Sequence, residues 1–260
     1  MNHSEVLALF DKEQRREIEI PGMRKDEFPR LVRFVRPSPG MSFVLYSDLD
    51  EATVDDAIES QIAYFSEEGL TFEWKAFAHD RPADLVERLV ARGFEAEEQD
   101  AIMVLDVHNA RIAEAFCVDI KVRRLSNPSE LEEVIRILEP VWGEDFSWVN
   151  DRLGGHMALP GYVSVYVAYL GEVAAATGWI YFGPGHFASM WGGSTLETYR
   201  GRGLYTALLA ARVAEAKERG LRYLTIDAGP MSRPIVARHG FEVITYATAC
   251  EWNKGGSEKA

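Results

Sequence analysis

Cysteine is scarce in this 260-residue chain, which contains only Cys117 and Cys250. Neither residue belongs to a C-x-x-C pair or to a cysteine-histidine cluster, so their spacing predicts neither a zinc site nor a redox pair. We therefore expect two reduced thiols and no bound metal, a pattern typical of a cytoplasmic protein.

The sequence also has no uninterrupted apolar run long enough for a membrane helix. Near the N-terminus only residues 6–10 form an apolar run, which is too short for a signal peptide. The longest candidate, residues 162–182, is broken by Gly171 and Glu172 and is rich in β-branched and aromatic residues. This composition predicts a hairpin of two buried strands instead of a membrane span.

Basic residues are outnumbered, because 28 Lys and Arg stand against 41 Asp and Glu, which gives a formal net charge of −13. Such an acidic balance disfavours nucleic acid or an anionic membrane as a partner. It favours a small cationic molecule such as an amine as the substrate. The oligomeric state stays open at this point.

Two common nucleotide motifs are missing. There is no G-x-x-x-x-G-K-[ST], and the nearest approach to G-x-G-x-x-G fails because Thr206 stands where the third glycine is required. Both absences disfavour nucleotide hydrolysis and dinucleotide binding as functions.

A different glycine-rich corner is present at residues 200–203, Arg-Gly-Arg-Gly, between a predicted strand and a predicted helix. The first N–H groups of a helix lack internal partners, and the helix dipole adds positive potential there. Gly201 and Gly203 leave room for close approach, while Arg200 and Arg202 add charge. The corner therefore predicts a pyrophosphate site, with a plain turn as the alternative reading.

Alternating periodicities predict an α/β chain. The expected helices are residues 1–22, 53–65, 82–91, 128–138, 147–153, a helix after the corner with a buried stripe of Leu204, Ala207, Leu208, Ala211 and Ala214, and 233–238. The expected strands are residues 31–35, 42–46, 72–77, 101–107, 119–124, 162–170, 173–182, 187–195, 223–227, 241–245 and 248–252. Residues 139–146 are expected to form an aromatic and acidic loop.

An internal echo indicates a duplicated fold. Residues 68–70, a strand, a helix and then residues 91–94 repeat the order of residues 219–221, a strand, a helix and then residues 238–241. We expect an N-terminal domain over residues 1–115, a second domain over 116–254 and a disordered tail over 255–260. Where the second half has its glycine corner, the first half has carboxylates in residues 47–51, which would repel a phosphate. The N-terminal domain is therefore expected not to bind the cofactor.

With these residues the chain resembles the GCN5-related N-acetyltransferase (GNAT) superfamily, whose hallmark is [Q/R]-x-x-G-x-[G/A] between a strand and a helix. Arg200 and Gly203 match the hallmark, and Gly240-Phe241 is similar to the pair that follows the family's last helix. The resemblance is specific over residues 189–244 and extends to residue 119, while the repeated first half is similar to tandem members such as mycothiol synthase. It implies a mixed, mostly antiparallel sheet flanked by helices, in two tandem copies.

The resemblance also implies an acetyl-CoA site. Pantetheine would pair with the strand at Gly193, Ser194 and Thr195, and the pyrophosphate would lie on the corner and first turn, namely Arg200, Gly201, Arg202, Gly203, Leu204, Tyr205 and Thr206. The chain departs from the family pattern at two positions. Tyr205 stands where the hallmark ends in Gly or Ala, and Val236 stands where the family often has a tyrosine that protonates the departing thiolate.

Other groups are therefore candidates for proton transfer and substrate binding. Ser232 and Tyr205 are candidate acids, and Asp227, at the end of its predicted strand, is the candidate base for a protonated amine, unless it is only a turn carboxylate. Trp142, Glu144 and Asp145 are candidate substrate-binding residues in the aromatic and acidic loop.

The function that the sequence favours is an acetyl-CoA-dependent N-acetyltransferase that acts on a small amine or an exposed amino group by direct attack on the thioester. Two alternatives stay open. One is a non-catalytic CoA-binding or regulatory module, which Val236 and the lack of an unmistakable base favour. The other is a transferase of the same fold that uses another acyl or aminoacyl donor.

Overall fold

The computed structural model describes residues 1–37, 40–110, 112 and 119–253, and it divides the chain into two compact units. The first unit comprises Met1–Met103, Asp227–Arg233 and Val243–Ala260, and the second comprises Val104–Ile226 and Pro234–Glu242. Helices flank a mixed and mostly antiparallel sheet, so the predicted fold class is confirmed. Cys117, the predicted boundary at residue 115 and the predicted disordered tail lie outside the described residues.

The first unit has strand order β1-β2-β3-β4-β12 around an apolar core that includes Trp74, Phe65 and the free thiol residue Cys250. Its elements are α1 (His3–Phe10), the π-helical segment η1 (Asp11–Arg16), β1 (Arg24–Phe28), β2 (Leu31–Val35), β3 (Ser42–Ser47), α2 (Val54–Glu68), β4 (Phe72–Phe77), α3 (Leu85–Val90), β5 (Glu95–Ala96) and β12 (Glu242–Trp252). The last strand, which the sequence analysis assigned to the second domain, pairs with β4 here.

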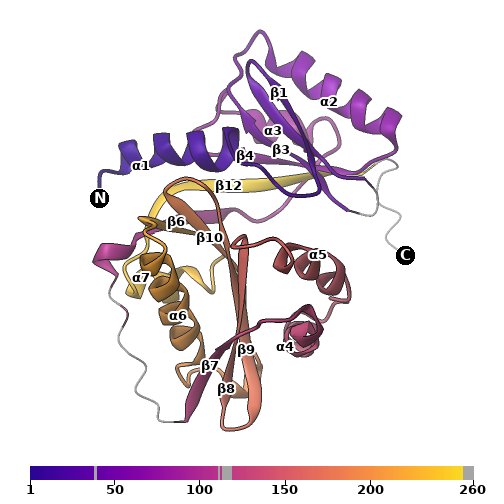
Figure 1. The fold of residues 1–260 in the computed structure, drawn as a ribbon. Coiled ribbons are helices and arrows are strands. Elements are labelled where there is room, and N and C mark those ends of the chain that lie inside the picture. The colour runs from indigo at the N-terminus through magenta and orange to yellow at the C-terminus, as the bar shows by residue number, and fades with distance from the viewer. Residues whose placement is uncertain (38–39, 111, 113–118, 254–260) are drawn as a thin grey trace. The chain divides into compact units, whose positions relative to one another are not determined.

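The second unit has strand order β11-β10-β9-β8-β7, with α6 against one face and α4 and α5 against the other (Figure 1). Its elements are β7 (Ile120–Arg124), η3 (Pro128–Leu131), α4 (Glu132–Trp142), α5 (Trp148–Met157), β8 (Val163–Leu170), β9 (Val173–Phe182), β10 (Phe187–Thr195), α6 (Leu204–Glu218), β11 (Tyr223–Ala228) and α7 (Arg233–Arg238). Strand β6 (Asp100–Asp106) is divided between the two units. The predicted hairpin of residues 162–182 is confirmed as β8 and β9.

Each unit contains one parallel strand pair that stops early. In the second unit β10 pairs with β11 only from Phe187 to Ser189. In the first unit β3 pairs with β4 only from Ser42 to Val44. In both units the first strand of the pair continues beyond the paired residues, and a helix connects the two strands, α6 in one case and α2 in the other. This shared order is the structural counterpart of the internal echo in the sequence.

The expected elements differ from the structure in several places. The helix expected over residues 1–22 ends at Arg16, where α1 has continued as the π-helical segment η1. Helix α4 continues through Pro140 to Trp142 and is followed by Gly143, whose φ is +72°, so the first half of the expected loop 139–146 is helical. Strand β1 was not expected, because its charged sequence RKDEF has no apolar alternation and its pairing with β2 forms it instead. Residues 242–252 form one strand where two were expected.

The buried face of α6 also differs from the predicted stripe. Leu204 and Leu208 are buried as expected, but Ala214 is exposed while Arg212 and Glu215 are buried. Arg212 occupies the space beside Gly178, where a Cβ atom would lie 3.0 Å from Nη1. Glu215 accepts hydrogen bonds from the hydroxyls of Ser164 at 2.8 Å and Tyr166 at 2.5 Å. Partners from other strands therefore override the helix periodicity.

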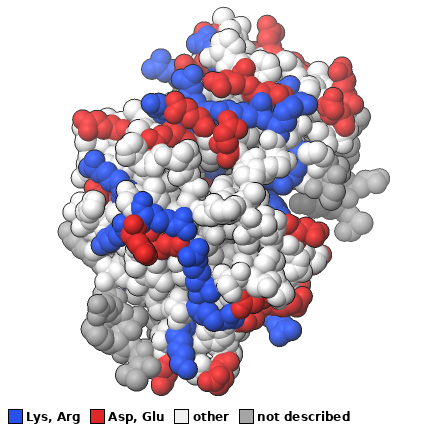
Figure 2. All heavy atoms as spheres, viewed as in Figure 1, with Lys and Arg blue, Asp and Glu red and all other residues white. Residues whose placement is uncertain are grey.

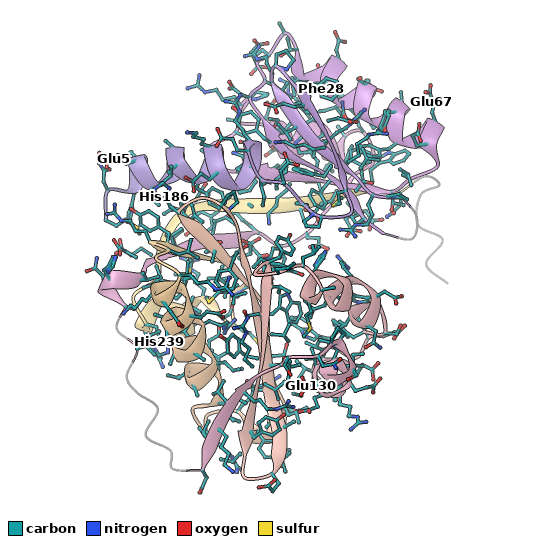
Figure 3. The ribbon with its side chains drawn as sticks, in the orientation of Figure 1. Glu5, Phe28, Glu67, Glu130, His186 and His239 are labelled. Atoms are coloured by element: carbon teal, nitrogen blue, oxygen red, sulfur yellow. The ribbon has the colours of Figure 1, made fainter. Side chains whose placement is uncertain are left out.

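Glu130 completes the predicted capping box at the start of η3 (Figure 3). Its carboxylate accepts backbone N–H bonds from Ser126 and Asn127 and pairs with Arg123, and these contacts lower the pKa of Glu130 to about 2. A depressed folded-state pKa stabilises the fold above the pKa of the unfolded chain, and this contribution disappears as the pH falls toward 2.

Glu130→Gln is accordingly expected to lower the free energy of unfolding by about 0.5–1 kcal/mol at neutral pH, the usual cost of weakening a cap. The difference from the wild type should vanish near the pH at which the wild-type carboxyl is protonated. Urea unfolding across a pH series measures this, with the exposed Glu132→Gln as a control. A difference that stays constant with pH would contradict the assigned cause.

Candidate functional site

Strand β10 carries a β-bulge at the end that leads to the glycine corner. Its register against β9 shifts between Trp191 and Ser194, and the two residues in the bulge are glycines. Gly192 has a φ of +62°, and a Cβ atom there would lie 1.8 Å from the ring of Trp179. A side chain at this position would therefore displace the tryptophan ring, so the bulge requires glycine.

Beyond Ser189 the edge of β10 that faced β11 is no longer paired with it, although β10 runs on to Thr195. Thr195 is the last residue of this strand, and its hydroxyl is buried without a hydrogen-bond partner among the described residues. An extended ligand with polar groups can therefore pair with this edge as a short additional strand. The residues concerned include Gly193, Ser194 and Thr195, the predicted pantetheine positions.

The corner that follows has the geometry of an anion site. Gly201 and Gly203 have φ values of +73° and +89°, and Gly203 is the N-cap of α6. The first bond of the helix runs from the N–H of Ala207 to the carbonyl of Gly203, so the preceding N–H groups have no partner within the helix. Apart from its two chain neighbours, no described residue has an atom within 4 Å of the place where a Cβ atom of Gly201 would stand. The corner is therefore open beside these N–H groups.

The other predicted corner residues surround these glycines. Arg200 turns back and donates from Nε to the carbonyl of Thr195 at 3.3 Å, and the Arg202 guanidinium lies 5.5 Å from the ring centre of Tyr199. The hydroxyl of Thr206, in the first turn of α6, lies 3.5 Å from Nε2 of His239, which Figure 3 labels. The side chain of Leu204 is buried in the core. His239 was missed because a lone histidine carries no spacing signal.

Tyr205 packs beneath the bulge. A Cβ atom on Gly193 would lie 3.0 Å from Cε2 and 3.8 Å from the hydroxyl oxygen of Tyr205. The anomalous tyrosine of the hallmark therefore fills the space that Gly193 leaves. Burial raises the pKa of Tyr205 in spite of the nearby Arg212, so the phenol stays protonated at neutral pH. Arg212 is itself buried, and its Nη2 has no hydrogen-bond partner among the described residues.

Trp142 and Ser194, which were predicted for different roles, contact each other at β10. The indole N–H of Trp142, at the end of α4, donates to the hydroxyl of Ser194 at 3.0 Å. The ring itself is 58% exposed. Glu144 is exposed, and Asp145 accepts bonds from the backbone N–H and hydroxyl of Ser147, as a local turn carboxylate does. Of the three predicted substrate-binding residues, only Trp142 contacts the strand.

Asp227 and Ser232 belong to the first unit, whereas the predicted cofactor-binding residues belong to the second. Asp227 forms an ion pair with Lys75 of β4. Burial disfavours the charge of Lys75, but Asp227 outweighs this effect and raises the pKa of the lysine. The Ser232 hydroxyl donates to the carbonyl of Gly229 at 3.2 Å within its own turn. Val236, at the position where the family often has a tyrosine, is fully buried and has no hydroxyl to donate.

Asp100 is a neighbouring carboxyl that the sequence analysis missed. Burial raises its pKa, and the negative charge of Asp227 raises it further. Its Oδ1 would lie 3.3 Å from a Cβ atom at Gly229, so this glycine admits the carboxyl. A carboxyl with a raised pKa is a better proton acceptor near neutral pH than an ordinary one. The only sequence signal was an aspartate directly before an apolar strand.

The corresponding corner of the first unit is filled by the protein's own groups. Oδ1 of Asp50 accepts bonds from the N–H of Ala52 at 3.1 Å and the hydroxyl of Thr53 at 2.8 Å, and Asp50 pairs with Arg30. Nε of Arg15 donates at 3.0 Å to the carbonyl of Leu45, the first residue of β3 beyond the parallel pair. Side chains therefore occupy the positions that stay open in the second unit.

The family comparison covers most of the second unit. Residues 130–241 match the model of the acetyltransferase (GNAT) family. This match agrees with the resemblance stated in the sequence analysis and supports an acyltransferase. A search of curated proteins found no match.

Solved structures with the same fold extend over nearly the whole chain. A GCN5-related N-acetyltransferase from Kribbella flavida aligns with a TM-score of 0.72 at 17% identity, covering 90% of this chain and 91% of its own. A functionally unknown protein from Staphylococcus epidermidis aligns with a TM-score of 0.70 at 14% identity, covering 93% and 98%. A tandem GNAT protein from the clavulanic acid biosynthesis pathway aligns with a TM-score of 0.60 at 13% identity, covering 93% and 86%. At these identities the likeness shows the fold alone.

Three further observations concern the described residues. Figure 2 shows acidic and basic side chains next to each other on the face in view, so the net charge of −13 is not gathered there into one acidic field. No described helix combines the length and apolar character needed to cross a membrane. In the same part of the chain, no group of three or more His, Cys, Asp and Glu is arranged to hold a metal ion.

Proposed function

We propose that this protein is an acetyl-CoA-dependent N-acetyltransferase that acts on a small amine or an exposed amino group. The observation that carries the proposal is the early end of the β10–β11 pairing, followed by a corner with two positive-φ glycines and open space beside Gly201. The free strand edge suits an extended pantetheine arm, and the N–H groups at the start of α6 suit a pyrophosphate. The buried, unpartnered hydroxyl of Thr195 offers the arm a further hydrogen bond. When bound, acetyl-CoA supplies an activated acetyl thioester.

The residues of the second unit would bind and orient the donor. Backbone groups of Gly193, Ser194 and Thr195 hold the arm as a strand, and Arg200 and Arg202 add positive charge at the corner. A backbone N–H at the bulge is suited to donate to the thioester oxygen, where negative charge develops during attack. The exposed ring of Trp142 offers an apolar wall for the acceptor, and Glu144 and Asp145 add negative charge for a cationic amine.

Two proton transfers accompany the reaction. An alkyl ammonium has a pKa near 10.4, so only about one molecule in 10³ is neutral at pH 7 and a base assists the attack. We assign this task to Asp227, with the neighbouring carboxyl of Asp100 as a second candidate. Tyr205 is our candidate for protonating the thiolate, because its phenol is protonated and its hydroxyl lies near Gly193. Ser232 is the remaining candidate.

Calorimetry and turnover together test the proposal. Acetyl-CoA should bind, and a broad panel of amines should release free CoA thiol in the presence of the protein. Absence of binding at millimolar acetyl-CoA would overturn the proposal. Binding without thiol release would favour a non-catalytic CoA-binding module, and a preference for a longer acyl or an aminoacyl donor would change the donor but keep the site.

Asp227→Asn is expected to lower kcat by about 10²-fold, the usual contribution of a general base, and to leave the affinity for acetyl-CoA unchanged. Asp100→Asn is the matched comparison and should lower kcat less than Asp227→Asn does. Asp227→Asn also removes the ion-pair partner of Lys75, so thermal unfolding must show that this variant is folded. An unchanged rate would remove Asp227 from the reaction.

We further propose that the first unit is a degenerate tandem copy of the second and does not bind the cofactor. The early end of the β3–β4 pairing supports the duplication, and Arg15 and Asp50 in the corresponding corner support the loss of binding. We also propose that the two copies are divided near residue 115 and that the protein is cytoplasmic. Calorimetry tests it, because acetyl-CoA should bind with a stoichiometry of one per chain.

A further inference from the structure

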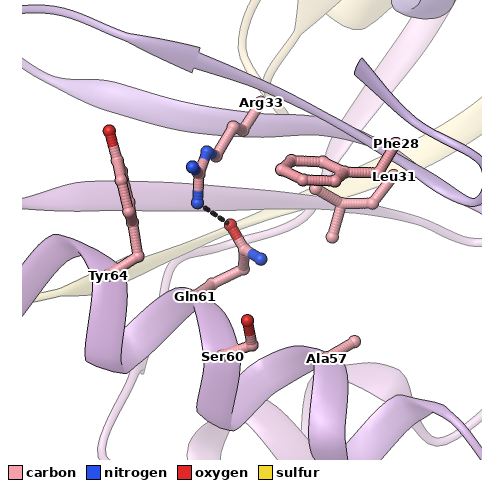
Figure 4. A pocket seen from close by; sticks show the side chains of 7 residues that line it. All are labelled: Phe28, Leu31, Arg33, Ala57, Ser60, Gln61 and Tyr64. Atoms are coloured by element: carbon pink, nitrogen blue, oxygen red, sulfur yellow. Dashed lines mark hydrogen bonds between the residues drawn. The ribbon is translucent and has the colours of Figure 1, made fainter. Parts of the chain in front are cut away.

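The first unit contains a hollow between α2 and the hairpin of β1 and β2 (Figure 4). Its volume is about 340 Å³, within the range of small-molecule sites. Residues of both elements line it: Phe28, Leu31, Arg33, Ala57, Ser60, Gln61 and Tyr64. Its residues are distinct from those of the acyl-donor site proposed above, so what it binds is a separate question.

Arg33 is the charged group of the hollow. It is 7% exposed, and its side chain is held at fixed positions on several sides. Nε donates to Oδ2 of Asp26 at 2.9 Å, and Nη1 donates to Oε1 of Gln61 at 3.0 Å. The guanidinium carbon lies 3.3 Å from the ring centre of Tyr64. The cation is therefore positioned before any ligand arrives, which lowers the cost of binding.

The hydrogen-bonded group of Arg33, Arg24 and Asp26 carries a net charge of one positive unit. Among the described residues, Asp26 is the carboxylate that bonds to Arg33, and it also accepts a hydrogen bond from Arg24 at 2.9 Å. Arg24 in turn donates to the hydroxyl of Tyr64 at the rim. Two guanidinium groups thus share one carboxylate, and a ligand with a single negative charge would balance them.

The amide of Gln61 supplies hydrogen-bond donors with a defined direction. Because its oxygen accepts from Arg33, its nitrogen points the other way, toward the side of Leu31 and Phe28, as Figure 4 shows. Ser60, the residue before Gln61 on α2, also lines the hollow, and its hydroxyl is drawn in Figure 4. Opposite these donors the walls are apolar, from Phe28, Leu31 and Ala57. Phe28 is 43% exposed and is free to cover a ligand from the solvent side.

We propose that this hollow binds a small monocarboxylate with an apolar or aromatic body. The carboxylate accepts hydrogen bonds from the Gln61 amide and the Ser60 hydroxyl beside the Arg33 cation, and the apolar body lies against Phe28 and Leu31. A phosphate dianion fits less well, because the excess charge is one and most of the lining is apolar. The proposal concerns the first unit alone and does not depend on acetyl transfer.

Phenylacetate and its neutral analogue phenylacetamide test the proposal with the full chain. Calorimetry should give a Kd between about 0.1 and 1 mM for phenylacetate, typical of a ligand of this size, and binding at least about tenfold weaker for the amide. Saturating acetyl-CoA should not displace phenylacetate. Equal affinity for acid and amide, or no binding of phenylacetate at about ten times the upper value, would overturn the proposal.

Two tryptophan substitutions on α2 locate the site. Ser60 is exposed at the rim, so Ser60→Trp should fill the hollow and abolish phenylacetate binding without unfolding the protein. Glu67→Trp, at an exposed position farther along the same helix (Figure 3), is the matched control and should bind as the wild type does. Binding that survives in Ser60→Trp would place phenylacetate elsewhere and refute the assignment. Gln61→Leu should weaken the acid about tenfold and the amide less, because the lost donors face the carboxylate.

Discussion

Gly201→Asp is expected to weaken acetyl-CoA binding by about 100-fold and to leave the fold intact. Aspartate tolerates a φ of +73° better than most residues, and its side chain would extend into open space. The new carboxylate would stand beside the N–H groups that are proposed to hold the pyrophosphate. At about 5 Å from two phosphate charges and an effective dielectric constant of about 40, the repulsion costs about 3 kcal/mol, which gives the 100-fold loss.

Two control variants separate charge from strain. Gly201→Asn has nearly the same shape and the same backbone demand, so the difference between Asn and Asp measures the anion alone. Gly171→Asp, in the β8–β9 turn, has a similar φ of +60° and open surroundings, and it should bind acetyl-CoA as the wild type does. Calorimetry with the three variants checks these results, and equal affinity for the Asp and Asn variants would remove the pyrophosphate from this corner.

Much of the second unit could be predicted because its signals are local. Strand β10 begins and ends at the residues expected from its composition, and the spacing of Gly201 and Gly203 predicted the corner where both have a positive φ. Such features depend on neighbours in sequence, namely periodicity, turn residues and helix ends. The first unit was predicted less well at β1, because an edge strand of charged residues forms only through its pairing with β2.

The buried charges could not be predicted, because their partners are distant in sequence. Arg212 and Glu215 replace the expected alanine stripe of α6 only because Gly178 leaves space and two hydroxyls of β8 donate to the glutamate. The contact of Trp142 with Ser194 depends in the same way on where α4 ends. Single-sequence patterns assign a polar residue to the surface by default, so tertiary pairing of this kind escapes them.

Arg15 is the clearest case of such a buried charge. Its side chain is 1% exposed, and Nη2 donates to both carboxylate oxygens of Asp80, at 2.7 and 2.9 Å. Asp80 is buried as well and also accepts from the backbone N–H of Phe77. Burial raises the pKa of Asp80, and Arg15 opposes this rise. The guanidinium lies 3.9 Å from the ring centre of Phe77. The N-terminal segment is thus attached to the turn after β4 through this buried ion pair.

Arg15→Met is therefore expected to lower the free energy of unfolding by about 3–5 kcal/mol, the usual cost of leaving one buried charge unpaired. Because the neutral acid is the form of Asp80 that is cheaper to bury alone, the loss should be smallest near pH 4 and should grow toward pH 7. The double variant Arg15→Met, Asp80→Asn should recover part of the loss, since asparagine can still accept from the N–H of Phe77. Urea unfolding of the single and double variants measures the coupling between the two residues. A loss below about 1 kcal/mol, or one that does not change with pH, would show that the pair contributes no more than an exposed ion pair.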